Sequence, residues 1–225
     1  MSFSVAIDGP AGAGKSTIAK AAAKETGFIY VDTGAMYRAI GLYMLSKKID
    51  IQNEEQVSGA LSAVSVTIAY EDGVQKVFLN GEDVSGKIRT QEVSEAASVV
   101  SVYASVRAHL LELQRNLAKT QDVIMDGRDI GTAILPDAPL KIYLTADAEI
   151  RGKRRYLELL EKGQDANLSA VIQEVRERDD RDMHREISPL RKAEDAVLVD
   201  TTNLSLSESE AVILTLIRER RKGGN

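Results

Sequence analysis

A glycine-rich segment near the N-terminus, Gly9-Pro10-Ala11-Gly12-Ala13-Gly14-Lys15-Ser16-Thr17, has the residue types and spacing of a phosphate-binding loop. It fits the Walker A pattern G-x-x-x-x-G-K-[ST], in which backbone N–H groups surround a polyphosphate, the lysine reaches the outer phosphates and the serine hydroxyl meets Mg²⁺. An apolar run, residues 4–8, precedes the segment, and a helical pattern, residues 18–23, follows it. The loop therefore joins a predicted strand to a predicted helix, whose N-terminal dipole favours an anion.

A second segment that could bind phosphate is Asp126-Gly127-Arg128-Asp129-Ile130-Gly131, which follows a buried apolar run. Arg128 and Asp129 are therefore expected on a loop at the carboxyl edge of a sheet, where α/β folds bind ligands. A guanidinium there can fork onto a phosphate, and a neighbouring carboxylate can accept a hydrogen bond from a ribose hydroxyl. The alternative is an Arg–Asp ion pair at the surface.

Arginines also recur in the segment 177–185. If it is helical, Arg178, Arg181, Asp182 and Arg185 stand at i, i+3, i+4 and i+7 and share one face. Three guanidinium groups on one face repel one another unless an anion lies between them. The alternative is a solvated helix with ion pairs to the intervening acids.

A further basic cluster follows the apolar run at residues 142–144 and consists of Arg151, Lys153, Arg154 and Arg155. Such a cluster is typical of a mobile lid that closes over a transferring phosphate. For any one of these residues, a solvated helix end is the alternative.

Short apolar runs separated by helical patterns predict the elements that position these residues. They cover residues 4–8, 28–32, 123–126, 142–144 and 196–200. Runs of this kind are typical of buried parallel strands. Four of them end in a carboxylate, at Asp8, Asp32, Asp126 and Asp200, so we expect the ligand site along the carboxyl edge of the sheet.

One stretch breaks this pattern. Val66, Ile68 and Tyr70 alternate with other residues, a turn follows at 71–73, and alternation resumes until a second turn at 80–81. This predicts an antiparallel hairpin, with a third strand near residues 84–88. The pattern alone leaves open whether this β insert folds over a substrate or only decorates the domain.

Several helix boundaries can be predicted from capping signals. Asn53 is an expected N-cap, Asp147 is expected to cap the helix over 149–161, and Ser207 with Glu210 forms an expected capping box. Thr90 is expected to start a long helical region that reaches about residue 119.

The overall composition limits the class of protein. The chain has 225 residues and a formal net charge of -5, which fits one domain with inserts and argues against broad binding to nucleic acid or anionic membranes. It contains no cysteine, which excludes disulfides and thiolate metal sites and fits a reducing compartment. No apolar run approaches the roughly 20 residues of a membrane span, and the N-terminus leaves no room for a signal peptide. We therefore expect a cytoplasmic protein.

A phosphate loop alone fits kinases, GTPases, motors and transporters. GTPases recognise guanine through an N-K-x-D segment, and this chain contains no Asn-Lys pair, which disfavours that class. The remaining alternatives are other small-molecule kinases, such as adenylate, uridylate or shikimate-type kinases, and a nucleic-acid-associated ATPase. Net acidity and the lack of an aromatic stacking platform weigh against the ATPase.

The motifs taken together resemble the bacterial cytidylate kinases, a family of nucleoside monophosphate kinases with the P-loop fold. The resemblance covers nearly the whole chain and rests on the segments 7–17, 32–38, 81–85, 88–90, 126–129 and 177–182, in this order. It implies a three-layer α/β fold with a five-stranded parallel sheet flanked by helices and a small antiparallel β insert. It also implies one P-loop kinase domain over residues 1–225, a monophosphate-binding insert over 64–97 and a short lid over 147–163.

The resemblance implies a role for each matching residue. The segment 9–17 would hold ATP, with Lys15 on its phosphates and Ser16 near Mg²⁺. Four arginines would be shared between the acceptor phosphate and the transferring phosphoryl group, namely Arg38, Arg128, Arg178 and Arg185. With Lys15, they would stabilise charge in the reaction.

Other positions would bind the acceptor nucleotide. Asp129 would hold its sugar, and Thr33 stands where relatives can carry serine, with a hydroxyl able to contact the acceptor site. Ser98, Arg107 and Asp182 match positions that read the cytosine ring in this family. The implied reaction is phosphoryl transfer from ATP to CMP or dCMP in pyrimidine nucleotide metabolism. The expected protein is a monomer with no nucleic-acid or membrane partner.

Overall fold

The computed structural model describes residues 2–161 and 163–223. These residues divide into two compact units. The first unit contains Ser2 and residues 29–123, and the second contains residues 3–28 and the described residues from 124 onward.

The larger of the two sheets has five strands in the order β2-β6-β1-β7-β8. Their bounds are β1 Ser4–Asp8, β2 Ile29–Asp32, β6 Val123–Gly127, β7 Leu140–Thr145 and β8 Val197–Asp200. β1 pairs in parallel with β7, with Val5 opposite Leu140, and β7 pairs in parallel with β8. The predicted five-stranded parallel sheet is confirmed, with strands within a residue or two of the predicted runs.

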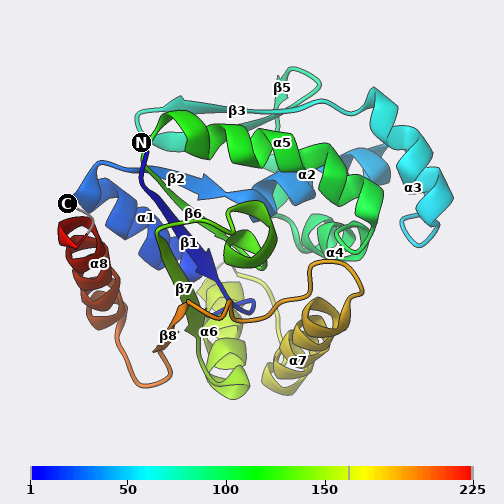
Figure 1. Cartoon of the computed structure of the whole chain (residues 1–225). Coiled ribbons are helices and arrows are strands. Elements are labelled where there is room, and N and C mark those ends of the chain that lie inside the picture. Colours follow the sequence, from blue (N-terminus) through cyan, green and yellow to red (C-terminus); the bar gives the residue numbers. More distant parts are fainter. Residues whose placement is uncertain (1, 162, 224–225) are drawn as a thin grey trace. The chain divides into compact units, whose positions relative to one another are not determined.

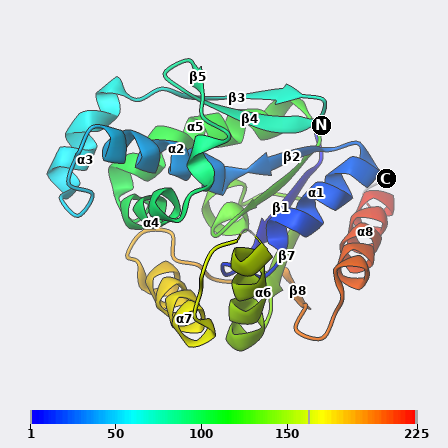
Figure 2. The same ribbon diagram turned by 180° about the vertical axis from the view of Figure 1, so that it is seen from behind.

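In the second unit, helices pack in pairs beside the strands. α1 (Lys15–Thr26) and α8 (Leu206–Lys222) pack side by side, as Figure 2 shows, and α6 (Ala148–Glu161) packs along α7 (Leu168–His184). Val5, Ala6 and Ile7 of β1 are fully buried. A single turn of π-helix, η3 (Ile130–Ile134), follows β6. The apolar strands therefore form a rigid base for the loops at their carboxyl ends.

The first unit is built mainly from helices. They are α2 (Thr33–Ser46), α3 (Glu54–Ala60), α4 (Gln91–Val100) and α5 (Ala104–Thr120), with short 3₁₀ turns η1 (Leu61–Ala63) and η2 (Lys87–Arg89). α2 packs against α4 (Figure 1). A Cβ on Gly41 would lie 2.9 Å from the backbone nitrogen of Ala97, so only glycine allows these two helices to approach so closely.

The predicted β hairpin is confirmed. β3 (Val66–Glu71) pairs antiparallel with β4 (Val74–Leu79), with Ile68 opposite Val77. Asp72 and Gly73 both have positive φ, 50° and 75°, as a tight hairpin turn requires.

The predicted third strand at 84–88 is wrong in position, because β5 is Glu82–Asp83. Asn80 and Gly81 turn the chain with φ of 50° and 85°, so pairing begins at once. The last backbone hydrogen bond to β4 comes from the Val84 amide, which donates to the carbonyl of Val77 at 2.9 Å. The Asp83 carboxylate then accepts a hydrogen bond from the Ser85 amide at 2.9 Å, where the chain turns. The residues predicted as strand lie instead in a turn and in η2.

Two predicted caps are confirmed and one is displaced. Asn53 accepts from the amide of Gln56, and Asp147 accepts from the amide of Glu149. The capping box uses Ser205 and Glu208 in place of Ser207 and Glu210. The apolar Leu206 already belongs to α8, so the helix and its cap begin two residues earlier than predicted.

The predicted long helix from Thr90 is interrupted. Thr90 does cap α4, but the helix ends at Val100 and α5 begins at Ala104. The Arg107 guanidinium donates to the carbonyl of Ser101 at 3.1 Å. This hydrogen bond holds a corner between the two helices that local helix propensity does not reveal.

Candidate active site

The glycine-rich loop lies between β1 and α1. Gly9 has a φ of 150°, and a Cβ there would lie 1.9 Å from the carbonyl oxygen of Leu144, so the loop can pass β7 only with glycine at this position. Gly12 and Gly14 have φ of 73° and 87°. Gly14 is the N-cap of α1 and supplies no side chain to the first amides of the helix. The loop and helix start thus have the geometry of an anion-binding site.

Lys15 is buried, and its Nζ donates to the carbonyl of Pro10 in the same loop at 2.7 Å. Burial lowers the pKa of Lys15 to about 7, and the positive charge of Arg128 acts in the same direction, while Asp126 and Asp182 oppose it. An anion close to Lys15 would favour its charged form. The lysine is therefore placed to respond to a bound phosphate.

Ser16 donates from Oγ to Oδ2 of Asp126 at 2.8 Å. Asp126 is buried near the end of β6. Among the described residues, no group of three or more His, Cys, Asp or Glu side chains is arranged to hold a metal ion. A hydroxyl with one carboxylate nevertheless fits Mg²⁺, which typically binds one or two protein oxygens and completes its shell with phosphates and water.

Asp126 was not among the residues expected in the site. Its signal in the sequence is the acid that ends the apolar run 123–125, a feature it shares with other strands of this sheet. The contact with Ser16 distinguishes Asp126 from the other acids at this edge.

Arg128 forms a partly buried ion pair with Asp182, with Nε 2.7 Å from Oδ2. Burial alone would raise the pKa of the Asp182 carboxyl, but Arg128, then Arg178 and Arg185, hold that pKa below its usual value. The Arg185 guanidinium also lies 3.6 Å from the Asp129 carboxylate. Residues from the loop after β6 and from the end of α7 are thus brought together, and the alternative of a surface ion pair between Arg128 and Asp129 is not observed.

The arginine-rich segment is helical up to His184, and Arg185 is the C-cap of α7. Asp179, Asp182 and Arg185 are buried and Arg178 is half-buried, whereas Arg181 is exposed. Arg181 therefore does not lie on the buried face with Asp182 and Arg185, and the prediction that all four residues share one face is wrong for Arg181. Packing against α6 turns Asp179 inward in its place.

The contacts of Arg151 explain why Asp179 faces the interior. Its guanidinium donates to both carboxylate oxygens of Asp179, to the carbonyl of Ala146 and, at 2.9 Å, to the carbonyl of Ala11 in the phosphate loop. Only 4% of Arg151 is exposed. It connects α6, α7 and the phosphate loop, and it is neither a solvated residue nor a free lid cation.

Arg154 and Arg155 of the predicted basic cluster have separate partners, and Lys153 is exposed. Arg154 donates to the carbonyl of Thr201 at 2.8 Å, and Arg155 pairs with Glu158. These residues do not form one cationic surface with Arg151 in this structure.

In the first unit, Asp32 is the centre of a charged cluster. Its Oδ1 accepts from the amide of Ala35 at the start of α2, and its Oδ2 accepts from Arg38 at 2.8 Å and Arg89 at 3.2 Å. Thr33, the first residue of α2, is buried. Arg89 was not expected in the site, although it lies in one of the segments that carry the family resemblance.

The β insert is fastened to this cluster. The side-chain amide of Gln75 in β4 accepts from the backbone N–H of Asp32 at 2.8 Å and donates to its carbonyl at 3.2 Å. The Tyr70 hydroxyl of β3 donates to the carbonyl of Tyr30 at 3.1 Å. The hairpin is therefore held against the residues that start α2.

Ser98 and Arg107 are both buried at the corner between α4 and α5. The Arg107 guanidinium lies 5.6 Å from the centre of the Tyr37 ring, within the range of a cation–π contact. The Ser101 hydroxyl donates to the carbonyl of Ser98 at 2.9 Å. The corner thus fixes two of the residues that were expected to read the base.

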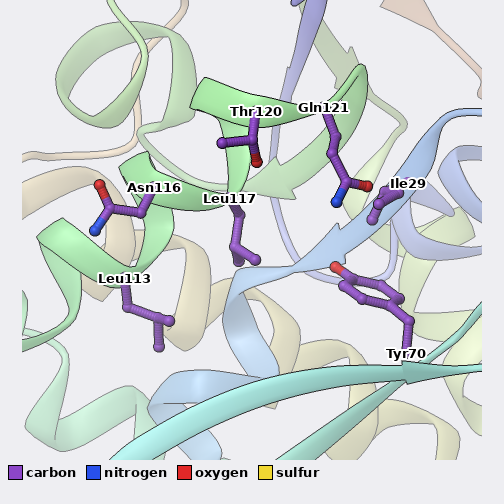
Figure 3. A pocket seen from close by; sticks show the side chains of 7 residues that line it. All are labelled: Ile29, Tyr70, Leu113, Asn116, Leu117, Thr120 and Gln121. Carbon is purple, nitrogen blue, oxygen red and sulfur yellow. The ribbon is translucent and has the colours of Figure 1, made fainter.

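A pocket of about 170 Å³ in the first unit lies apart from these residues. Figure 3 shows it between the end of α5, the start of β2 and Tyr70 of β3, and its lining is Ile29, Tyr70, Leu113, Asn116, Leu117, Thr120 and Gln121. None of these side chains carries a positive charge. The pocket lies at the start of β2, whereas Asp32 ends this strand and Thr33 follows it. Because its lining carries no positive charge, the pocket is not suited to binding a phosphate group.

A family model described as "Cytidylate kinase" matches residues 5–219. The chain belongs to the cytidylate kinase family. All the site residues expected from the sequence, from Gly9 to Arg185, fall within the matched range.

Curated relatives agree with this assignment over nearly their full length. A cytidylate kinase of Caldicellulosiruptor bescii is 52% identical over 214 residues, which are 95% of each chain. A cytidylate kinase of Lactobacillus johnsonii is 49% identical over 218 residues, 97% of this chain and 95% of the relative.

Solved structures with low sequence identity share the fold. An uncharacterized protein from Eubacterium ventriosum has a TM-score of 0.52 at 12% identity, covering 96% of this chain and 98% of that one. A gluconokinase from Sinorhizobium meliloti has a TM-score of 0.50 at 16% identity, covering 98% and 94%. The P-loop kinase architecture expected from the sequence is confirmed.

Proposed function

We propose that this protein transfers the γ-phosphoryl group of ATP to CMP or dCMP, giving ADP and CDP or dCDP. The observation that carries the proposal is the match to the cytidylate kinase family over residues 5–219. The phosphate loop supports the proposal, as do the half-buried Arg128 and Arg178 and the buried Arg185 of the second unit, because they would supply the positive charge that such a transfer needs.

The donor nucleotide is assigned to the phosphate loop, residues 9–17. Its backbone amides and the dipole of α1 would hold the ATP phosphates, and Lys15 would contact their oxygens. Ser16 and Asp126, which are hydrogen bonded at 2.8 Å, would hold Mg²⁺. When bound, Mg²⁺ neutralises charge on the phosphate oxygens.

Four arginines, Arg38, Arg128, Arg178 and Arg185, would be shared between the acceptor phosphate and the transferring phosphoryl group. The attacking phosphate oxygen is already ionised near neutral pH, so no side chain has to remove a proton. Catalysis then consists of positioning and charge stabilisation. Three of these guanidinium groups lie beside a carboxylate that compensates their charge: Arg38 beside Asp32, Arg128 beside Asp182 and Arg185 beside Asp129.

The base and sugar are assigned to other residues. Ser98, Arg107 and Asp182 would read the cytosine ring, Asp129 would hold the sugar, and Thr33 would contact the acceptor through its hydroxyl. The burial of Ser98, Arg107 and Asp182 supports this assignment, because polar groups shielded from water discriminate between ligands more strongly.

The remaining proposals concern organisation. Residues 64–97 would act as the monophosphate-binding insert and residues 147–163 as a short lid, of which residue 162 lies outside the described residues. No helix among the described residues has the length and apolar character needed to cross a membrane. We propose a cytoplasmic monomer that works on small molecules without a nucleic-acid or membrane partner.

The test is ADP release from Mg-ATP with CMP, dCMP, UMP, AMP, GMP or no acceptor. We expect strong turnover with CMP and dCMP only. Turnover led by another monophosphate would retain the kinase mechanism but contradict the assignment of Ser98, Arg107 and Asp182. Turnover independent of any acceptor would contradict the kinase function.

A further inference from the structure

Asp8 is a buried carboxylate to which the proposed mechanism gives no role. It ends β1 immediately before the phosphate loop, and only 4% of it is exposed. A buried carboxylate costs free energy unless it is hydrogen bonded. Its partners therefore indicate what it does.

Both oxygens of Asp8 accept backbone hydrogen bonds from a segment more than 120 residues away. Oδ1 accepts from the amide of Ile130 and Oδ2 from the amide of Gly131, each at 2.7 Å. These are the first two residues of η3. The amides at the start of a helical turn have no partner within the turn, and Asp8 supplies both acceptors.

The residue next to this turn does not take the place of Asp8. Asp129 precedes η3, but its side chain makes no capping hydrogen bond and lies near Arg185 instead. The Asp129 carbonyl accepts from the amides of Ala133 and Ile134. The cap on η3 thus comes from β1, and this leaves the Asp129 side chain to face the arginine cluster.

Close packing reinforces this arrangement on both sides. Gly9, which follows Asp8, passes β7 so closely that a Cβ would lie 1.9 Å from the Leu144 carbonyl oxygen. A Cβ on Gly131 would lie 3.2 Å from Cδ of Lys141 and 3.4 Å from Oδ2 of Asp8. The start of η3 therefore lies directly against the carboxylate.

We propose that Asp8 is a positioning residue that fixes the loop carrying Arg128 and Asp129 relative to the phosphate loop. The inference rests on the proposed function, in which the loop carrying Arg128 and Asp129 contacts the acceptor nucleotide and the phosphate loop holds ATP. Because both Asp8 oxygens accept from backbone amides, the residue acts through backbone geometry. A displacement of about 1 Å between reacting groups can cost about 10²-fold in rate.

The test is Asp8→Asn, because asparagine has the same shape but only one acceptor oxygen. Its NH₂ group would face one of the two amide donors, so the loop would shift. We expect the KM for CMP to rise about tenfold or more with a lower kcat, whereas the Kd for ATP, measured without acceptor, changes less than about threefold. General damage to the fold is not expected to raise the KM for CMP while leaving the Kd for ATP nearly unchanged.

Asp200→Asn is the matched control. Asp200 also ends a strand of the same sheet, but it is exposed and its carboxylate accepts from nearby Thr202, so its kinetic constants should equal those of the wild type. If Asp8→Asn has a KM and kcat within about twofold of wild type, or loses ATP and CMP binding equally, the proposal is wrong.

A second variant keeps the test decisive if Asp8→Asn does not fold. Gly131→Val leaves Asp8 intact and adds two methyl groups beyond a Cβ position that already lies 3.4 Å from Oδ2 of Asp8, so it should push the same contact apart and raise the KM for CMP while sparing ATP binding; unchanged constants would overturn the proposal. The wild type is assayed first. If it phosphorylates another monophosphate, the proposed substrate is wrong and the variants are compared with that acceptor; if it phosphorylates none, both proposals fail.

Discussion

At the scale of single residues, burial distinguishes arginines that otherwise look equivalent. Arg178 and Arg181 belong to the same helix, but Arg178 is half-buried beside Asp182 and Arg181 is exposed. The electrostatic influence of Arg178 on Asp182 places it in the cluster that also contains Arg128 and Arg185. The two arginines therefore form a matched pair for mutation.

Arg178→Ala should be chiefly a kcat defect. An arginine that contacts the transferred phosphoryl group is typically worth about 10³-fold or more in rate, because it stabilises charge that develops in the transition state. The KM values for ATP and CMP should change far less. Steady-state kinetics measure both, and Arg181→Ala should behave as wild type. Equal kcat losses in the two variants would contradict the role of Arg178.

The titration of Asp8 gives a prediction about stability. Burial raises the pKa of Asp8 to about 7 from its usual 3.8, with Asp129 contributing and the amide hydrogen bonds and Lys15 opposing the shift. Tyr143 of β7 also senses the Asp8 charge. The folded state binds the proton of the Asp8 carboxyl more tightly than the unfolded state does. The resulting contribution to the free energy of unfolding is therefore fully present below pH 3.8 and is lost as pH rises through about 7.

The free energy of unfolding of the wild type, relative to Asp8→Asn, should therefore fall by about 1.4 kcal/mol per pH unit between roughly pH 5 and 7 and then level off. Urea denaturation of both proteins at about pH 5, 6, 7 and 8 measures this difference. A difference that stays constant over this range would show that the Asp8 pKa is not raised.

At the scale of elements, the buried pair of Arg151 and Asp179 joins α6 to α7 and reaches the phosphate loop through Ala11. Breaking such a pair leaves an uncompensated charge in the interior. We expect Arg151→Met to lower the free energy of unfolding by about 3–5 kcal/mol, as measured by urea denaturation. Arg155→Met, which removes a more exposed partner of Glu158 on the same helix, should cost less than about 1 kcal/mol.

The double variant Arg151→Met with Asp179→Leu separates charge from packing. It removes both charges, so it should recover part of the stability that Arg151→Met loses. A double variant that is less stable than Arg151→Met would show that the contacts of Asp179 with other groups matter more than its pairing with Arg151.

At the scale of the whole molecule, the sequence predicted what local patterns encode and missed what distant contacts decide. The strands were predictable because short apolar runs ending in acids are typical of buried parallel strands, and the hairpin because Asp72-Gly73 and Asn80-Gly81 are strong turn signals. The break between α4 and α5 depends on a side-chain contact at the corner. No local pattern marks it.

In the candidate site, too, local motifs could be predicted from the sequence and contacts between distant residues could not. The phosphate loop is a continuous motif, so the sequence alone identifies it. The roles of Asp126 and Arg151 cannot be predicted in this way, because they depend on contacts with Ser16 and Asp179 that come from other elements. Asp8 is the extreme case, since its two partners are 122 and 123 residues away along the chain.

The two compact units allow a test of where each nucleotide binds. The phosphate loop belongs to the second unit, and the corner containing Ser98 and Arg107 belongs to the first. A ligand that binds only the folded state protects the backbone around its site from hydrogen exchange. An unreactive ATP analogue alone should therefore protect residues 9–17, and CMP alone should protect the α4–α5 corner at residues 98–107.

Hydrogen–deuterium exchange with mass spectrometry, with each ligand added separately at about 100 times its Kd, measures both patterns. At that concentration one bound ligand stabilises the folded state by about 2.7 kcal/mol, which is enough to slow exchange that requires opening of the site. AMP at the same concentration is the control for CMP. Equal protection of the corner by AMP and CMP would contradict base reading by Ser98 and Arg107, whereas protection by CMP alone would support it independently of turnover.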